Sequence, residues 1–433
     1  MKKILLIILI TGGVINICAQ QELSLSDAIK TGLKNNYDLE MMRNNEEIAD
    51  INNTWGNTGA MPTIDFSMTG RENYNTNSTE DYRTQNLSPD INLNWLIFNG
   101  FSAKINKQRY EELEKQSQGN TAILIESTIQ DIIIAYNNCL LQQELIEVFK
   151  ELSDLSKDRY KRILDSKEIG AGTTYESLQA KTSWLEDQSN YLMQKNTFDN
   201  AVRTLNYIMA IDDDKHWEFI SELNTETLDY SLEDLMNSLL KNNNTLKNQY
   251  IYQSLMAKAT ALAKSAYYPK LSLNTGVSNT NLSNYYTGTT PDVTQKYTDT
   301  YVGLTLSWTI FNGGSRKRSV EIAKISEESA QVEVKQMEHS LKNQLLQLYN
   351  NYEVYKAVLT LAEEKEETAK LNMELSAEKL NNGSINSFNY RDIQIVYMNA
   401  AIARLQAIND VIQSNTDLLR ITGGIIDEYN QTE

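Results

Sequence analysis

This sequence contains little cysteine, histidine and proline, and each shortage excludes a class of site. Cys18 lies in an amino-terminal apolar segment and Cys139 stands alone in an apolar helical run, so neither a disulfide framework nor a thiolate metal site can form within one chain. His216 and His339 lie far apart, outside any catalytic motif. A glycine-rich phosphate-binding loop is also missing. We therefore expect no enzyme, no cofactor and no bound metal.

Proline occurs only four times, at positions 62, 89, 269 and 291. All four lie in or beside segments with the alternating pattern of strands, and none interrupts the long helical patterns. Because proline kinks or breaks a helix interior, this distribution permits very long, unkinked helices.

Long apolar runs and excess positive charge are also absent. After the first twenty residues no stretch of about 20 apolar residues remains, so we expect no membrane-spanning helix, and any part that enters a bilayer must consist of strands. The formal net charge of −17 argues against nucleic acid or anionic lipid as the main partner.

Residues 1–20 have the pattern of a secretory signal peptide. Two lysines are followed by an apolar run over 4–10 and a short tail to Gln20. A lipid-modified Cys18 is an alternative, but Ile17 precedes it, where lipoprotein signals have a small residue. We expect cleavage beside residues 19 and 20 and export of the mature chain.

The rest of the chain is a tandem repeat. The sequence pattern of residues 23–29 recurs from Tyr230, 207 residues later. From Trp95 in the first copy and Trp308 in the second, the offset between the copies becomes 213 residues. The six extra residues of the second copy are expected in a surface loop, since 71–88 and 278–300 are rich in Asn, Thr, Ser and Tyr. The predicted domains are the signal peptide 1–20, the first repeat 21–210, an equatorial linker 211–230, the second repeat 231–424 and a tail 425–433.

Each repeat contains a strand pair with one apolar and one polar face. The predicted strands are 62–70 and 90–98 in the first copy, and 269–277 and 301–311 in the second. A soluble sandwich would show the same alternation, but the lengths approach the 9–11 residues that cross a bilayer. Strands in lipid must close on themselves and about eight form the smallest barrel, so four per chain require an oligomer. The apolar face is expected to contact lipid through Trp95, Trp308, Leu304 and Leu306, among others.

Each strand pair leads into a long helical hairpin, predicted over 101–209 and 314–421. The first arm of each hairpin has apolar residues in alternating steps of three and four, typical of a coiled-coil seam. The second arm is about half as long. The helix that precedes each strand pair supplies the missing half if it stacks end to end on this second arm.

Together the signal peptide, the Leu-Ser-Leu-Ser-Asp-Ala-Ile start, the strand pairs ending in Phe-Asn-Gly, the helical hairpins and the repeat resemble the TolC-type outer membrane efflux proteins. The resemblance covers essentially the whole mature chain. It implies a mixed fold, in which a homotrimer combines an outer-membrane β-barrel of four strands per protomer with a long periplasmic coiled-coil barrel of helices. The implied partners are a periplasmic adaptor and an inner-membrane pump of the resistance-nodulation-division or ATP-binding-cassette type.

The resemblance also implies a gate near the turns of the hairpins. The acidic pore positions of the family fall on Asn389 and Asp392, of which only Asp392 is acidic, and a further acidic position falls on Glu176. Each has a simpler alternative: Asp392 would be a solvated helix residue, and Glu176 the last residue of a Thr-x-x-Glu capping box. The turns that would contact the adaptor contain Gly170, Gly172, Gly383 and Ser384, although glycine there also serves the chain reversal.

The sequence therefore predicts a passive, gated export duct in the outer membrane. The alternative function is a coiled-coil spacer anchored in that membrane that does not conduct. Such a spacer would need the heptads but not the amphipathic strand pairs in both repeats. The exported substrate is not encoded in any pattern of the sequence.

Overall fold

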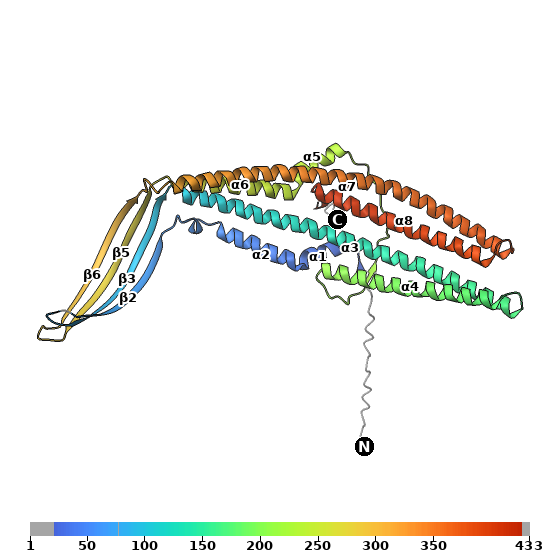
Figure 1. The fold of residues 1–433 in the computed structure, drawn as a ribbon, viewed down its shortest axis with the longest axis horizontal. Helices are drawn as coiled ribbons and strands as arrows, with labels where there is room; N and C mark the ends of the chain where they lie inside the picture. The colour runs from blue at the N-terminus through green and yellow to red at the C-terminus, as the bar shows by residue number, and fades with distance from the viewer. Residues whose placement is uncertain (1–20, 77, 427–433) are drawn as a thin grey trace, which may run out of the picture.

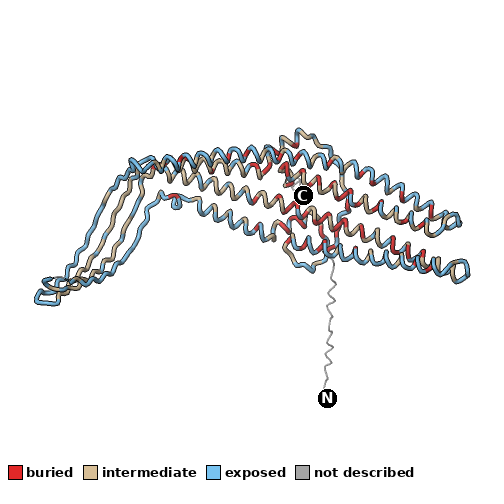
Figure 2. The backbone as a smooth tube through the Cα atoms, viewed as in Figure 1, coloured by how far each residue is buried: buried red, intermediate tan, exposed pale blue. Residues whose placement is uncertain are grey.

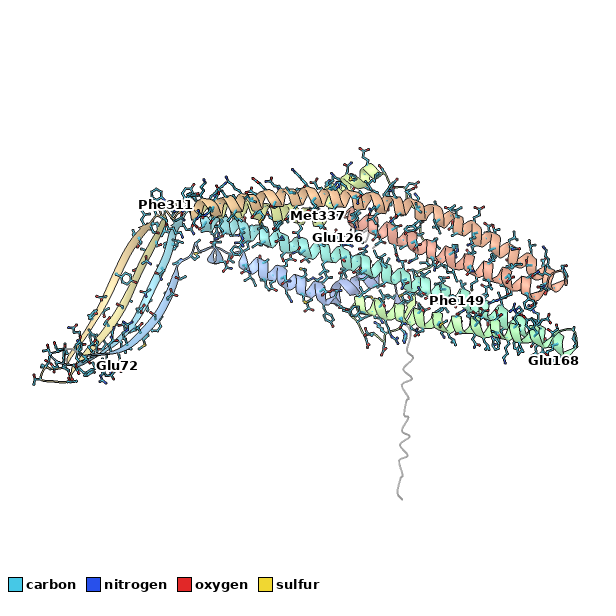
Figure 3. The ribbon with its side chains drawn as sticks, in the orientation of Figure 1. Glu72, Glu126, Phe149, Glu168, Phe311 and Met337 are labelled. Carbon is cyan, nitrogen blue, oxygen red and sulfur yellow. The ribbon has the colours of Figure 1, made fainter. Side chains whose placement is uncertain are left out.

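The computed structural model of the protein describes residues 21–76 and 78–426. It is elongated, with a four-stranded sheet at one end and the turns of two helical hairpins at the other (Figure 1). Glu72 lies toward the far end of the sheet and Glu168 at the opposite end of the molecule (Figure 3). The predicted signal peptide lies outside the described residues.

The elements follow the chain in this order: β1 (Gln21–Leu23), α1 (Leu25–Asn35), α2 (Tyr37–Asn52), the 3-10 helix η1 (Gly56–Thr58), β2 (Thr63–Asn75), β3 (Tyr82–Asn99), α3 (Ser102–Glu168), α4 (Thr174–Ile208), β4 (Trp217–Phe219), α5 (Leu232–Asn242), α6 (Asn244–Ser265), β5 (Lys270–Tyr286), β6 (Val293–Ser307), α7 (Ser315–Asn381) and α8 (Ser387–Ile421).

The helix bounds repeat with the two offsets found in the sequence. Helices α5 and α6 begin 207 residues after α1 and α2, and α7 and α8 begin 213 residues after α3 and α4. The hairpin helices also have matching lengths, 67 residues for α3 and α7 and 35 residues for α4 and α8, whereas α6 is longer than α2, with 22 residues against 16. The tandem repeat is therefore confirmed.

The sheet has the strand order β2-β3-β5-β6, and all of its neighbours are antiparallel. Its register pairs Ile64 with Leu93, Trp95 with Leu273, and Leu273 with Leu304. Directly paired residues project from the same face, so the predicted apolar residues do share one face. Nothing in the described chain covers this face, and the strands are exposed or intermediate along their length (Figure 2).

The strands are longer than predicted, and the predicted loops at 71–88 and 278–300 were wrong. The ladder continues from Thr63↔Asn94 to Asn75↔Tyr82, and in the second hairpin to Asn284↔Val293. Backbone pairing with distant residues extends the strands through sequences that look like loops. The connections 76–81 and 287–292 have equal length, so the six extra residues lengthen the strands and not the loop.

The predicted end of the last strand at 311 is also wrong, since β6 ends at Ser307. β6 ends opposite Lys270, the first residue of its partner β5, so the residues that follow Ser307 have no strand to pair with. β3 also ends opposite Lys270, with Asn99. A bulge between Leu96 and Phe98 makes Phe98 pair with Leu271, so Ile97 leaves the regular alternation.

The Phe-Asn-Gly motif builds the junction between strand and helix. The side chain of Asn99 accepts a hydrogen bond from the Ala103 N–H, and Asn312 accepts one from Arg316 in the second copy. Each therefore satisfies an N–H that has no partner within its helix. Gly100 has a φ of 67°, and a Cβ there would lie 2.3 Å from the Ser265 carbonyl oxygen. The junction therefore requires glycine for both conformation and space.

The short helices complete the length of the long ones. Asn243, the N-cap of α6, donates its side-chain N–H to the carbonyl of Ile421 at the end of α8, at 2.9 Å. Asn36, the N-cap of α2, donates to Ile208 at the end of α4, at 3.3 Å. Each short helix thus begins where a returning helix ends, as the end-to-end stacking predicted. At 1.5 Å per residue, α3 and α7 each extend about 100 Å.

Buried side chains gather where these helix ends meet, in the middle of the molecule (Figure 2). Tyr136 and Tyr352 are among the largest fully buried side chains and donate hydrogen bonds to the carbonyls of Leu23 and Leu228, each at 2.9 Å. Strand β4 of the linker pairs in parallel with β1, and its Trp217 belongs to the same core. These contacts attach the linker between the repeats to the helices.

Candidate functional site

Both helical hairpins reverse direction through the same turn. Gly170 and Gly383 have φ values of 77° and 71°, and a Cβ at either position would meet nothing within 4 Å. In each turn the next residue donates its N–H to a carbonyl five residues earlier, Ala171 to Ser166 and Ser384 to Lys379, both at 2.8 Å. This is the glycine-terminated helix end known as a Schellman motif. Gly172 has a different constraint, because a Cβ there would lie 3.0 Å from the backbone nitrogen of Lys167.

Glu176 forms the capping box at the start of α4. Its carboxylate accepts hydrogen bonds from the Thr173 N–H, at 2.9 Å, and from the Thr173 hydroxyl, at 2.8 Å, while the Thr173 hydroxyl accepts from the Glu176 N–H. These bonds, the backbone bond first, lower the pKa of Glu176. The capping alternative is therefore present in the structure, and it accounts for this carboxylate without a role in a gate.

Asn389 and Asp392 lie three residues apart near the start of α8, and both are exposed. Residues at this spacing are neighbours on one helix surface. The N–H of Asn389 bonds to the side chain of Asn386, the N-cap of α8, at 2.8 Å. The two predicted gate positions on the second hairpin are thus close together, whereas Glu176 belongs to the first hairpin and is bonded to Thr173.

An ion pair that the sequence did not predict joins the two hairpins near this end. Arg391 on α8 lies 2.7 Å from Asp187 on α4. Ser156 on α3 donates its hydroxyl to the same carboxylate and accepts an N–H from Arg391 at 3.0 Å. Asp187 and Ser156 are buried. Since Arg391 follows Asp187 by more than two hundred residues, no local pattern links the two.

A second arginine lies close to this ion pair. Arg159 on α3 donates to the carbonyl of Ser387, in the first turn of α8, at 3.3 Å. Burial lowers the pKa of Arg159, and repulsion by Arg391 lowers it further, against attraction from Asp187 and Asp392. The start of α8 thus contacts α3 through cationic side chains.

The middle of the helical part contains a cavity of about 330 Å³ between α3, α6, α7 and α8. Its lining includes Glu126 and Met337 (Figure 3), together with Gln130, Asp417 and Arg420. Gln130 donates to Asp417 and accepts from Arg420, at 2.6 Å from the latter. Burial raises the pKa values of Glu126 and Asp417. This region was not singled out by the sequence.

Of the residues predicted to contact lipid, Trp95, Leu304 and Leu306 lie on the uncovered face of the sheet, and Trp308 follows the end of β6. Leu304 and Leu306 are 67% and 70% exposed. Trp95 donates its indole N–H to the carbonyl of Ala60, at 2.9 Å, and Trp308 makes the equivalent bond to Tyr267, at 3.1 Å. Each tryptophan therefore holds the chain that enters the first strand of its repeat.

In the part of the chain that the structure describes, no helix is both long and apolar enough to cross a membrane. Over the same residues, no three His, Cys, Asp or Glu side chains are grouped so that they could hold a metal ion. Cys139 is buried, and burial raises the pKa of its thiol to about 12.

Comparison with known proteins agrees with this architecture. A family model described as outer membrane efflux protein matches residues 28–210 and 235–424, one segment in each repeat. A search of curated proteins finds no significant match. The fold is similar to that of the Campylobacter jejuni CmeC outer membrane channel, with 18% identity, a TM-score of 0.76 and coverage of 92% of this chain and 85% of that one.

Two further solved structures share the fold. The Vibrio cholerae outer membrane protein VceC has 12% identity and a TM-score of 0.72, covering 92% of this chain and 96% of its own. The Neisseria gonorrhoeae MtrE outer membrane channel, in its open state, has 14% identity and a TM-score of 0.73, covering 92% and 89%. At these identities the likeness concerns the fold.

Proposed function

The chain belongs to the outer membrane efflux protein family, and we propose that it acts as a trimeric channel-tunnel, passively exporting substrates that an inner-membrane pump and a periplasmic adaptor deliver. Membership of this family assigns the protein to the outer membrane, and its family and fold are those of channel proteins and not of enzymes. The assembly, the partners and the gate are the parts that we propose.

The observation that carries the proposal is a sheet with two open edges and an uncovered apolar face. Within residues 21–76 and 78–426, β2 pairs only with β3, and β6 pairs only with β5. Open edges in lipid would leave backbone N–H and C=O groups without partners, at a cost of several kcal/mol each. Pairing β6 of one protomer with β2 of the next satisfies both edges, and three protomers close one barrel.

The opposite face of the sheet supports a water-filled interior. On it, Asn274 donates to Asn94 at 2.7 Å, and Tyr301 donates to Asn92 at 2.8 Å. Asn94 and Asn92 alternate along β3 with the apolar side chains of the other face. A barrel with the apolar face toward lipid would place this polar ladder around an aqueous pore.

The helices supply the tunnel in this proposal. The sheet leads directly into α3 and α7, whose length of about 100 Å is suited to crossing much of a periplasm. The hairpin turns lie at the end farthest from the sheet (Figure 1). They would therefore meet the adaptor, with Gly170, Gly172, Gly383 and Ser384 at the surface of contact. The pump would be of the resistance-nodulation-division or ATP-binding-cassette type.

We place the gate at the start of α8. Asp392 and Asn389 are exposed there and would face the pore, and a three-fold ring of Asp392 carboxylates would attract cations. Only one acidic residue per protomer occupies this pair of positions, so the ring is weaker than a double one. Glu176 is a secondary candidate, because its carboxylate already caps α4.

The assembly is tested by the mass of the protein after extraction from the outer membrane in mild detergent. Native mass spectrometry should find a species of three chains, and the trimer should persist on dilution because its edges are hydrogen-bonded between protomers. A monomer that remains folded in the membrane would contradict the proposal, since its sheet edges would then be open to lipid.

A further inference from the structure

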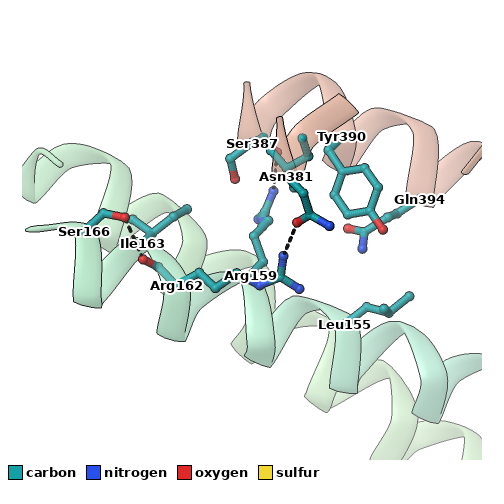
Figure 4. Close-up of a pocket in the computed structure, with 10 residues that line it drawn as sticks. Leu155, Arg159, Arg162, Ile163, Ser166, Asn381, Ser387, Tyr390 and Gln394 are labelled. Atoms are coloured by element: carbon teal, nitrogen blue, oxygen red, sulfur yellow. Dashed lines mark hydrogen bonds between the residues drawn. The ribbon is translucent and has the colours of Figure 1, made fainter. Parts of the chain in front are cut away.

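A small pocket lies between the two hairpins, close to their turns (Figure 4). Its volume is about 240 Å³, and its walls come from α3 of the first hairpin and from α7 and α8 of the second. Its polar lining comprises Arg159, Arg162 and Ser166 of α3, Asn381 of α7, and Ser387, Tyr390 and Gln394 of α8. Leu155 and Ile163 of α3 and Leu380 of α7 add apolar surface.

Three side chains of this pocket have buried polar atoms without a hydrogen-bond partner. Gln394 is 1% exposed, and neither its amide oxygen nor its amide nitrogen is bonded within the described chain. The Nε of Arg159 and the hydroxyl of Ser387 are unbonded in the same way. Buried polar groups are nearly always satisfied in folded proteins. Three such side chains around one cavity therefore indicate that the cavity holds a polar occupant.

The charge of the pocket indicates the sign of this occupant. Among the described residues, neither Arg159 nor Arg162 forms an ion pair. Arg159 contacts only the backbone oxygen of Ser387, at 3.3 Å, and Arg162 contacts the amide oxygen of Asn381, at 3.5 Å. Both distances are long for hydrogen bonds. The nearby carboxylate of Asp187 is already paired with Arg391. Asp187 and Asp392 lie near enough to attract Arg159, but no carboxylate of the described residues is paired with either guanidinium group that borders the pocket.

We propose that this pocket binds a small organic acid, with its carboxylate on Arg159 and Arg162 and its apolar body against Leu155, Ile163 and the ring of Tyr390. Guanidinium groups bind carboxylates through strong, charge-assisted hydrogen bonds. The amide of Gln394 would bond to a second polar group of the ligand. A pocket of about 240 Å³ has room for a compact acid with one ring.

Binding at this position would have a mechanical consequence. Because α3 belongs to one hairpin and α8 to the other, a ligand that contacts both favours the arrangement in which they lie side by side. It would raise the thermal stability of that arrangement, by an amount that grows with the logarithm of the ligand concentration once that concentration exceeds the dissociation constant. The inference concerns this pocket alone, and it stands whether or not the protein conducts.

Benzoate is the probe for this site, and benzamide is the matched neutral control, since it has nearly the same shape without the charge. Isothermal titration calorimetry on the purified full chain in detergent should show benzoate binding with a dissociation constant of ~1 mM or below. Benzamide should bind at least about tenfold more weakly, because the charge-assisted bonds are lost. Equal affinity for the two, or no benzoate binding at ~10 mM, would overturn the proposal.

Substitutions at the pocket locate the binding. Arg162→Met changes an exposed side chain and should weaken benzoate binding about tenfold without loss of folding. Arg159→Met tests the buried guanidinium. Lys161→Met is the control, because it removes the same charge from an exposed position on α3 outside the pocket. Benzoate affinity that falls equally in the Lys161 and Arg162 variants would show a general charge effect and overturn the proposal.

Discussion

The guanidinium of Arg391 lies 2.7 Å from the carboxylate of Asp187, and this contact joins the start of α8 to the middle of α4. The pair is almost completely buried, with 13% of the Arg391 side chain and 3% of the Asp187 side chain exposed. Ser156 of α3 bonds to both partners. One polar cluster therefore holds three helices of two hairpins together near their turns.

Removing one partner of this pair should destabilise the turn end strongly. Arg391→Met leaves the Asp187 charge buried, at a cost of about 3–5 kcal/mol. Hydrogen exchange of the α4 and α8 amides, followed by mass spectrometry, should show faster exchange near the turns. Lys161→Met, which breaks an exposed pair with Asp158, is the control and should change exchange little. The double variant Arg391→Met with Asp187→Leu should recover much of the loss, and a double variant as unprotected as the single one would contradict this account.

The carboxylate of Glu126 gives a pH dependence of opposite sign to that of an ordinary surface acid. Burial raises its pKa in the folded state, so the folded protein holds more protons than the unfolded chain from the usual value of 4.5 up to the raised one. Stability from this group is therefore greatest at low pH and falls as the pH rises through that window. Glu126→Gln should raise the melting temperature at pH 7 and reduce its rise on acidification to pH 5.

The exposed Glu328 on α7 provides the matched control for that experiment. Glu328→Gln should leave the melting temperature and its pH dependence nearly unchanged, since a surface substitution away from such features changes stability by about 0.5 kcal/mol or less. Glu126→Gln keeps a side-chain oxygen that can accept the hydrogen bond from Asn244, at 2.8 Å in the native protein, so it removes the charge without removing the acceptor. If both glutamine variants behaved alike, burial would not be the cause of the Glu126 effect.

The two faces of the sheet should respond differently to the same charge. Leu304→Arg places a guanidinium on the apolar face, where lipid contact would cost about 2–4 kcal/mol at mid-bilayer. Thr305→Arg places it on the polar face of the same strand, one residue away. The amount of trimer in purified outer membranes should fall for the first variant and much less for the second. Equal loss in both would contradict the lipid-facing assignment.

Much of the fold follows from the sequence, because the repeat and the seams are local patterns. The offsets of 207 and 213 residues reappear in the bounds of every paired helix, and the family predicted from the motifs is confirmed by the family match over both repeats. The Phe-Asn-Gly motif also marks the junction between strand and helix in both repeats, where Asn99 and Asn312 each accept an N–H from the first turn of the following helix.

The length of the strands could not be predicted in this way. Residues such as Asn284 and Thr84 have the composition of loops, yet their side chains bond to each other at 2.9 Å across neighbouring strands. Pairing with a strand some two hundred residues away decides their conformation, and a local pattern carries no information on it. The Arg391–Asp187 pair and the pocket that contains Arg159 could not be predicted either, because each is formed by residues of both repeats that lie far apart in the sequence.

The central claim, a gated aqueous pore, is tested most directly by planar-bilayer conductance of the purified mature trimer. Wild-type protein should give small currents that multivalent cations reduce, and Asp392→Ala should give larger currents with weaker cation block, because the carboxylate ring at the start of α8 is removed. Larger currents in the variant would support both the pore and the position of the gate. A trimer that inserts into the bilayer but never conducts, in wild type or variant, would contradict the account and favour a structural spacer.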